Sequence, residues 1–189
     1  MTLQASEAGY LQPSKNSIQQ KMNQRFLRIG LISIACLAIA YAVWNYSQPR
    51  YGAGDEAPDI QLTLMNGQAA RLSDLRGKYV LLQFWGSWCG PCRQENPHLV
   101  ELYRKYHEKG FEVFSIGLEF NPNAWKNAIL NDQLEWPYHS LESANFDGPL
   151  ANQYNIKSIP STFLLNPQGV IMGVNLNPDY LKKMLSEKL

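Results

Sequence analysis

Two cysteines follow directly on a long apolar run and stand where a helical pattern begins. The run, Tyr79–Trp85, is almost continuously apolar, which predicts a strand buried on both faces, as in the centre of a largely parallel sheet. After the cysteines, apolar residues recur at helical spacing, and Gly110 supplies a stop signal. A buried strand that leads into an amphipathic helix predicts an α/β fold.

The cysteines lie in the segment Trp88-Cys89-Gly90-Pro91-Cys92, whose spacing lets two sulfurs meet within one helical turn. Cys89 falls at the expected helix N-terminus, where unpaired N–H groups and the helix dipole favour a thiolate. The thiolate is the attacking species, so we predict that Cys89 is the nucleophile. Cys92, one turn further, is predicted to be less exposed and to resolve the mixed disulfide.

A cysteine pair with this spacing could also bind zinc or form an inert structural disulfide. A zinc site needs two more ligands, and neither Cys36 nor the three histidines form a second pair. An inert disulfide stays open for a domain exported from the cytoplasm. The position of the pair between strand and helix favours a redox-active pair.

The N-terminal part predicts a membrane anchor. Residues 29–44 contain no charge, and with their apolar neighbours they give roughly 16 to 20 residues, enough for a transmembrane helix. Aromatic residues gather at the end of this run, as at a lipid–water interface. We therefore predict a basic and polar tail over residues 1–28, a single transmembrane helix over 29–46 and an extended, mobile linker over 47–58.

Charge predicts the orientation of this anchor. The first 50 residues hold five basic residues and one acidic residue, whereas Asp55, Glu56 and Asp59 follow the apolar run. The positive-inside rule then places the N-terminus in the cytoplasm and the body beyond the cell (inner) membrane, in the periplasm or its equivalent. The alternatives are a cleaved signal peptide, at the small-residue sites around Ala40, and a lipid-modified Cys36, and both also export the body.

The remaining residues 59–189 predict one domain. A hairpin over Ile60–Leu72 turns at Asn66-Gly67 and precedes the strand and helix described above. Further patterns predict strands at residues 111–118, 136–141, 162–165 and 170–173, and helices at 122–132, 149–154 and after Asn177.

Several motifs together resemble the thioredoxin superfamily. Residues 84–93, Phe-Trp-Gly-Ser-Trp-Cys-Gly-Pro-Cys-Arg, resemble its active site, and residues 158–164, Ser-Ile-Pro-Ser-Thr-Phe-Leu, resemble its cis-proline loop. Residues 54–60, 66–67 and 72–78 narrow the resemblance to the membrane-anchored, extracytoplasmic thiol-disulfide oxidoreductases of the TlpA/ResA type. The resemblance covers about residues 52–189. It implies a thioredoxin-like fold, a central mixed sheet flanked by helices, with an N-terminal β-hairpin extension.

The resemblance also assigns roles to residues. The two cysteines match the redox-active disulfide, and Pro160 matches the cis-proline that, with Ile159, faces the disulfide and binds the partner's chain. Trp88, Gly90 and Pro91 border the disulfide and complete the expected substrate-binding surface, with Trp88 as a partly exposed lid. Taken alone, the Ile159-Pro160 pair also fits an ordinary trans turn before a strand.

Glu95 is the remaining catalytic candidate. Thioredoxins carry a buried aspartate in the strand before the motif, but Gln83 stands at the matching position here. The resemblance to ResA-like proteins implies that Glu95 handles the proton that Cys92 must lose before it attacks. The alternative is a solvated glutamate that only interacts with the helix dipole.

The resemblance implies an extracytoplasmic enzyme that exchanges thiols with disulfide-bearing protein substrates. Gly-Pro between the cysteines resembles the reducing thioredoxins and favours a reductase, re-reduced by a membrane electron donor and, by family analogy, serving cytochrome c biogenesis. No cofactor beyond the cysteine pair is expected. A net charge of +1 and the absence of a glycine-rich phosphate loop argue against nucleic-acid and nucleotide binding.

Four alternatives stay open at this point. A disulfide oxidase or isomerase would use the same residues at another reduction potential. A peroxidase of this superfamily has threonine three residues before the reactive cysteine, where this chain has Gly86. Thioredoxin-like copper carriers use a CxxxC motif with a distal histidine, and this chain has CxxC. The last alternative is a tethered binding module without enzymatic activity.

Overall fold

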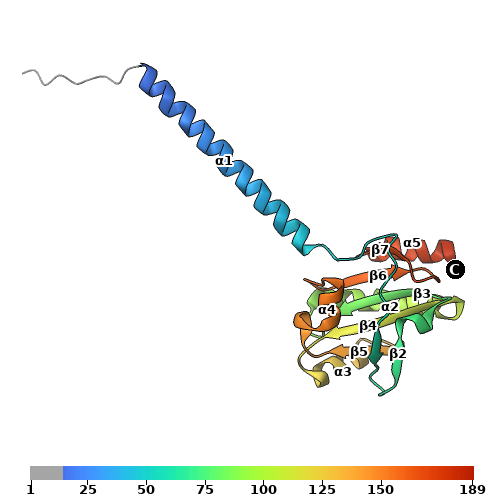
Figure 1. Ribbon diagram of the computed structural model, residues 1–189. Coiled ribbons are helices and arrows are strands. Elements are labelled where there is room, and N and C mark those ends of the chain that lie inside the picture. Colours follow the sequence, from blue (N-terminus) through green and yellow to red (C-terminus); the bar gives the residue numbers. More distant parts are fainter. Residues whose placement is uncertain (1–14) are drawn as a thin grey trace, which may run out of the picture. The chain divides into compact units, whose positions relative to one another are not determined.

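The structure is a computed structural model that describes residues 15–189, except for the side chains of residues 15–18 and 21. It divides into two compact units, one ending at Tyr46 and one comprising Ser47–Leu189. Figure 1 shows the first unit as the long helix α1 and the second as a layered α/β body. The two units are described separately below.

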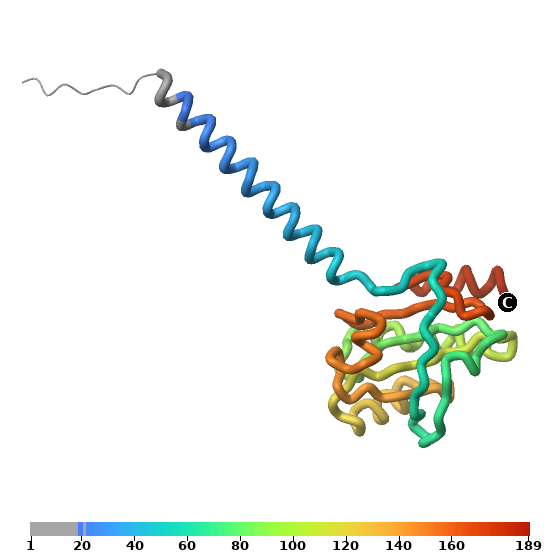
Figure 2. The backbone as a smooth tube through the Cα atoms, in the orientation of Figure 1, coloured from blue at the N-terminus to red at the C-terminus, as the bar shows by residue number. Residues whose placement is uncertain are grey.

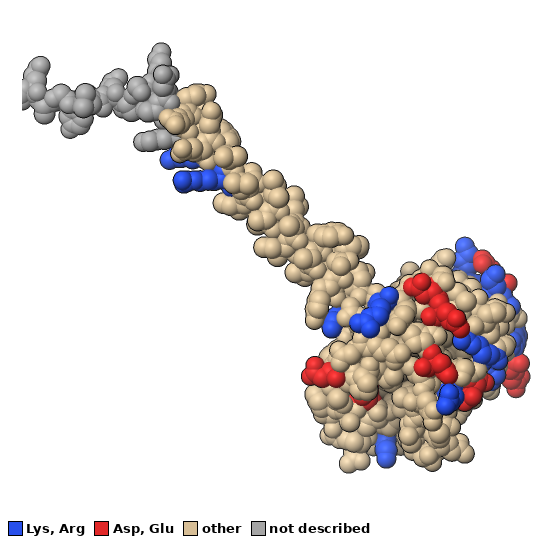
Figure 3. All heavy atoms as spheres, viewed as in Figure 1, with Lys and Arg blue, Asp and Glu red and all other residues tan. Residues whose placement is uncertain are grey.

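Helix α1 spans Lys15–Ser47 and is 33 residues long. Its segment Met22–Ser47, 26 residues, is long and apolar enough to cross a membrane. No charged residue occurs between Arg28 and the end of the helix. Figure 3 shows this part of the helix in tan, beyond the blue basic side chains near its start. The helix is longer than the predicted span of 29–46. It takes in half of the predicted polar tail, whose residues 1–14 lie outside the described part of the chain.

The body is built around a five-stranded mixed sheet in the order β5-β4-β3-β6-β7. Strands β3, β4 and β5 run parallel, β6 runs antiparallel to β3, and β7 antiparallel to β6. The strands are β3 (Tyr79–Trp85), β4 (Phe111–Leu118), β5 (Tyr138–Glu142), β6 (Ser161–Leu165) and β7 (Ile171–Val174). This arrangement confirms the predicted thioredoxin-like fold.

The hairpin extension and the helices also agree with the patterns in the sequence. The hairpin pairs β1 (Gln61–Thr63) with β2 (Ala69–Arg71). The helices of the body are α2 (Gly90–Tyr106), α3 (Pro122–Asn131), α4 (Pro149–Tyr154) and α5 (Pro178–Lys188), with short 3-10 turns η1 (Leu72–Leu75), η2 (His107–Lys109) and η3 (Asn145–Asp147). Proline opens α3, α4 and α5, where its missing N–H is not needed.

Helices cover both faces of the sheet (Figure 1). On one face, α2, α3 and α5 bury apolar side chains against alternate strand residues such as Leu81, Trp85 and Val113. On the other face, α4 and apolar residues of the β1–β2 hairpin and its flanks pack against Leu82, Phe84 and Phe114. Because successive strand residues point to opposite faces, the continuous apolar strands supply both cores.

The linker predicted to be mobile is instead fixed to the body. The backbone N–H of Gly54 donates to the carbonyl of Ile171 over 2.8 Å, and the N–H of Ile171 donates to the carbonyl of Asp55 over 2.9 Å. Ala57 is buried, and its N–H donates to Gly169. The prediction was wrong because β7 is an edge strand whose free backbone groups bind this extended segment. Its path along the body can be followed in Figure 2.

Strand β5 also begins two residues later than the predicted start at Trp136. The indole of Trp136 is buried, and its N–H donates to the hydroxyl oxygen of Ser115 over 2.9 Å. Trp136 therefore packs in the core just before β5 begins. The apolar pattern of the sequence does not distinguish a buried residue within a strand from a buried residue that precedes it.

Candidate active site

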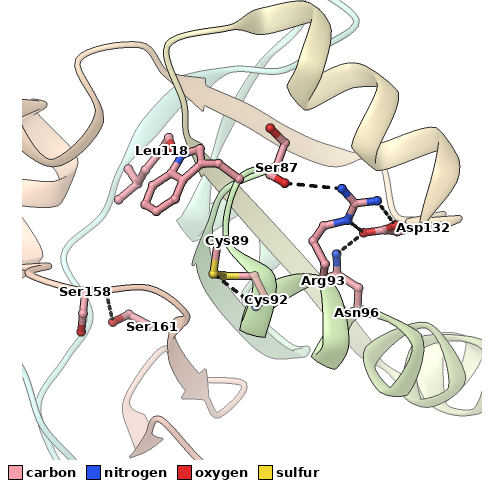
Figure 4. The surroundings of a disulfide bond; sticks show 10 residues. Ser87, Cys89, Cys92, Arg93, Asn96, Leu118, Asp132, Ser158 and Ser161 are labelled. Atoms are coloured by element: carbon pink, nitrogen blue, oxygen red, sulfur yellow. Dashed lines mark hydrogen bonds and ion pairs between the residues drawn. A yellow bond between two sulfur atoms is a disulfide. The ribbon is translucent and has the colours of Figure 1, made fainter.

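The two cysteines form a disulfide at the junction of β3 and α2 (Figure 4). Their sulfurs are 2.03 Å apart and their Cα atoms 5.3 Å apart. The sulfur of Cys89, at the N-cap of α2, accepts the backbone N–H of Cys92 over 3.2 Å. A sulfur in this position also lies at the positive end of the helix dipole, which favours a thiolate after reduction.

The two sulfurs differ in accessibility. Cys89 retains 4% of its surface and Cys92 none, while the intervening Gly90 and Pro91 are exposed. Cys89 is therefore the more accessible of the two residues, and the order of attack remains a prediction.

The cis-proline loop faces this disulfide. The peptide bond between Ile159 and Pro160 is cis, so the alternative of an ordinary trans turn was wrong. Ile159 packs against the core cluster that contains both cysteines. The hydroxyl of Ser161 donates to the carbonyl of Ser158 over 2.8 Å and closes the loop, which Figure 4 shows across from the disulfide.

Trp88, directly before Cys89, is 52% exposed but held in place. Its indole N–H donates to the carbonyl oxygen of Leu118 over 3.0 Å. The ring also contacts Phe146 edge-on, with the ring centroids 6.1 Å apart. Trp88 is thus partly exposed, as predicted, while its role as a lid stays a prediction; Trp85 is fully buried in the core.

A second carboxylate beside the motif was not predicted from the sequence. Glu119 is only 5% exposed, accepts a hydrogen bond from the hydroxyl of Ser87 and accepts the backbone N–H of Asn121 over 3.1 Å. It immediately follows the predicted strand that ends at Leu118. A polar residue at the carboxyl end of a strand next to the motif is the signal that could have identified it.

An ionic network holds the first turns of α2. Arg93 donates from Nη2 to Asp132 Oδ1 over 2.6 Å, and Asn96 donates to Asp132 Oδ2 over 2.7 Å. Arg93 also donates from Nη1 to the carbonyl oxygen of Ser87 over 3.4 Å. Figure 4 shows these side chains converging on Asp132. The network therefore links the active-site loop to the segment that follows α3.

Glu95 lies half-buried in a groove that it shares with Pro160 and Thr162. Burial raises the pKa of its carboxyl above the usual value, and nearby His98 opposes this shift. The groove continues to Gln83, whose side-chain oxygen accepts the hydroxyl of Ser115 over 2.8 Å. Glu95 is thus the titratable group of this groove and lies on the same side as the cis-proline.

Gly86 occupies the position of the peroxidase threonine. A Cβ atom at this residue would lie 2.8 Å from the indole nitrogen of Trp88 and 3.1 Å from the carbonyl oxygen of Leu118. The loop as folded has no room for a side chain here. Within the described residues, no group of three or more His, Cys, Asp or Glu side chains could hold a metal ion.

Comparisons with known proteins agree with this geometry. Residues 53–174 match the model of the AhpC/TSA family. The thiol-disulfide oxidoreductase ResA of Bacillus subtilis (strain 168) is 30% identical over 158 residues, which cover 82% of this chain and 86% of the relative. ResA of Oceanobacillus iheyensis is 31% identical over 169 residues, covering 85% of this chain and 86% of that relative.

A solved structure that resembles this chain is also that of a thiol-disulfide oxidoreductase. The thiol-disulfide oxidoreductase from Bacteroides fragilis NCTC 9343 is 32% identical and superimposes with a TM-score of 0.66. The match covers 71% of this chain and 100% of that chain.

Proposed function

The chain belongs to the AhpC/TSA family and is a thiol-disulfide oxidoreductase of the ResA type, and we propose that it reduces protein disulfides on the extracytoplasmic side of a membrane. The observation that carries the chemistry is the Cys89–Cys92 disulfide at the N-terminus of α2, with Cys89 reachable and the cis-proline loop opposite. The direction of electron flow is supported by Gly90-Pro91 between the cysteines, which resembles the reducing thioredoxins.

The reaction begins with the reduced dithiol. The Cys89 thiolate attacks one sulfur of the partner's disulfide, forms a mixed disulfide and releases the first partner thiolate. Cys92 then loses its proton and attacks the sulfur of Cys89, which releases the second partner thiolate and forms the Cys89–Cys92 disulfide. Two electrons pass to the partner, so each cycle requires re-reduction by a dithiol donor, which we assign to a membrane protein.

We assign the proton of Cys92 to Glu95. A half-buried carboxyl with a raised pKa can take up a proton nearer to neutral pH than a solvated glutamate can. The fixed Trp88 ring, Gly90, Pro91 and the loop at Ile159 would form the surface on which the partner chain lies during exchange.

Helix α1 supports the proposed location. Its segment Met22–Ser47 is long enough to span a bilayer, and basic residues precede it. Protease treatment of intact spheroplasts tests the orientation. We expect the body to be digested from outside, and protection of the body would contradict the proposed side.

The reduction potential tests the direction. The full chain in detergent micelles would be equilibrated with dithiothreitol or glutathione buffers, and the thiols of Cys89 and Cys92 trapped and counted. A potential near or below about −250 mV supports a reductase, and a value near about −120 to −180 mV indicates an oxidase or isomerase. A pair that does not cycle would contradict the enzyme and leave a binding module.

Among reductase duties, we propose the reduction of apocytochrome c cysteines before haem attachment. The support is the TlpA/ResA-type resemblance together with an anchored, exported active site. A disulfide-closed CxxCH peptide, offered beside an unrelated peptide disulfide of similar potential, tests this duty. Faster turnover of the CxxCH peptide is expected, and equal rates would instead indicate general disulfide reduction.

A further inference from the structure

An aromatic side chain next to the active-site loop has no role in the chemistry described above. Phe120 is 73% exposed, although it lies only two residues beyond Leu118, whose carbonyl binds the indole of Trp88. Exposure of a large apolar side chain carries a cost in water that burial against a partner would remove.

The backbone around Phe120 is fixed to the active-site loop. On one side, Leu118 accepts the indole N–H of Trp88. Directly before Phe120, the buried carboxylate of Glu119 accepts the hydroxyl of Ser87, and directly after it, the N–H of Asn121 donates to the same carboxylate. The residues on both sides of Phe120 are therefore fixed to the loop that leads into Cys89.

Two further aromatic side chains lie in or against the active-site loop. Trp88 is half-exposed, and its ring contacts the partly buried Phe146 edge-on. Glu119, the acidic residue of this loop, is turned inward and contributes almost no charge to the surface. We call the side chains of Trp88, Phe120 and Phe146 the aromatic platform.

We propose that the aromatic platform binds an aromatic or aliphatic side chain that flanks the cysteine in the partner's disulfide, and that Phe120 sets this preference. The inference rests on the proposed function. Because only 4% of Cys89 is exposed, a partner sulfur can reach it only if the partner chain lies over the bordering residues. Residues next to the partner's cysteine extend about 3.3–3.6 Å per residue from it, so their side chains would lie over the residues that border Cys89 in this loop.

The test compares two exposed apolar residues of α3 and its preceding loop. Phe120→Ser removes the proposed contact, and Leu130→Ser, at a side chain that is 72% exposed, is the matched control. The full chain in detergent, kept reduced by dithiothreitol, would reduce two peptide disulfides that differ only in having Phe or Ser before the cysteine. A third substrate, glutathione disulfide, lacks such a side chain.

For the Phe-flanked peptide, we expect Phe120→Ser to lower kcat/KM about five- to tenfold, as loss of a partly buried aromatic contact predicts. The Ser-flanked peptide and glutathione disulfide should change less than about twofold, and Leu130→Ser should change none of the three. Phe120→Leu, which keeps an apolar side chain, should restore most of the rate.

The other possible outcomes would contradict either this inference or the proposed function on which it rests. Equal losses on all three substrates would mean that Phe120 supports the loop, and no loss would mean that it is not a contact. If the wild type sediments as a dimer and Phe120→Ser as a monomer, the platform instead covers a second copy of the chain. If the wild type reduces none of the disulfides, it is the proposed function that fails.

Discussion

Asn96, fully buried in α2, donates its side-chain N–H to the carboxylate of Asp132 across 2.7 Å. The same carboxylate receives the guanidinium of Arg93, which also reaches the carbonyl of Ser87 in the active-site loop. One acidic side chain thus organises both the first turns of α2 and the loop before Cys89.

Replacement of Asp132 by alanine should therefore destabilise the protein. The buried amide of Asn96 would lose its acceptor, and Arg93 would lose its counter-ion, so we expect a loss of about 2–3 kcal/mol in the free energy of unfolding. Urea denaturation of the oxidised protein measures the loss. As a control, Glu135→Ala removes the carboxylate that pairs with Arg104 on the exposed surface and should change little. Equal effects of the two variants would contradict the structural role of Asp132.

Single cysteine variants should separate the two sulfurs. Cys92→Ser leaves the reachable Cys89 without its resolving partner, so we expect it to accumulate a mixed disulfide with a protein substrate. In a Cys36→Ser background, which removes the free cysteine of α1, Cys89→Ser leaves only the fully buried Cys92 and should form little adduct. Non-reducing gel electrophoresis after acid quenching measures both. A larger adduct with Cys89→Ser would reverse the assigned roles.

Glu95→Gln should change two pH profiles. Burial raises the pKa of Glu95, so the folded protein holds this proton more tightly than the unfolded chain, and the charged form destabilises the fold above that pKa. We expect the glutamine variant to be more stable than the wild type at neutral pH, with the difference shrinking as the pH falls through the raised pKa towards the ordinary value of 4.5. In the exchange reaction, the part of the acidic limb that follows protonation of Glu95 should disappear, whereas the part that reflects loss of the thiolates should remain.

Thermal unfolding across pH and stopped-flow exchange measure the two effects of Glu95. Glu101→Gln, on the exposed surface of the same helix, is the matched control and should leave both profiles unchanged. An unaltered rate profile in Glu95→Gln would mean that Glu95 only borders the groove.

Because of the buried side chain of His139, the stability of the fold should decrease in acid. The ring of His139 stacks on Trp136, and burial lowers its pKa from 6.5 to about 4. Between these values the unfolded chain takes up the proton first, so stability is full above pH 6.5 and falls as the pH drops towards 4, by about 3 kcal/mol in total. The free energy of unfolding, measured from neutral pH down to about 4, should fall less steeply in His139→Phe. Parallel curves for the two proteins would contradict this assignment.

The sequence predicted most of the fold because its strongest patterns are local. The continuous apolar strand at Tyr79–Trp85, the turn at Asn66-Gly67 and the cap at Asn177 each specify structure through their immediate neighbours. The cis-proline loop was found only through its resemblance to a family, since the Ile159-Pro160 dipeptide alone fits either isomer.

The features that the sequence did not predict depend on contacts between distant segments. Glu119 is buried because Ser87 lies beside it, 32 residues earlier in the chain. The segment around Gly54 is fixed because it forms backbone hydrogen bonds with β7, the edge strand of the sheet. The residues around Gly54 do not identify this distant partner. Likewise, the composition of α3 does not show that Asp132, just beyond it, binds Arg93 in another helix.

The absence of a side chain at Gly86 has an evolutionary consequence. The space that a Cβ atom would need is occupied by the indole of Trp88 and the carbonyl of Leu118. A change to threonine would therefore displace the aromatic ring before any new hydroxyl could act, and a smaller residue at position 88 would have to come first or at the same time. A substitution at Gly86 would thus act first on Trp88, by disturbing the hydrogen bond that fixes its indole to the carbonyl of Leu118 beside the disulfide.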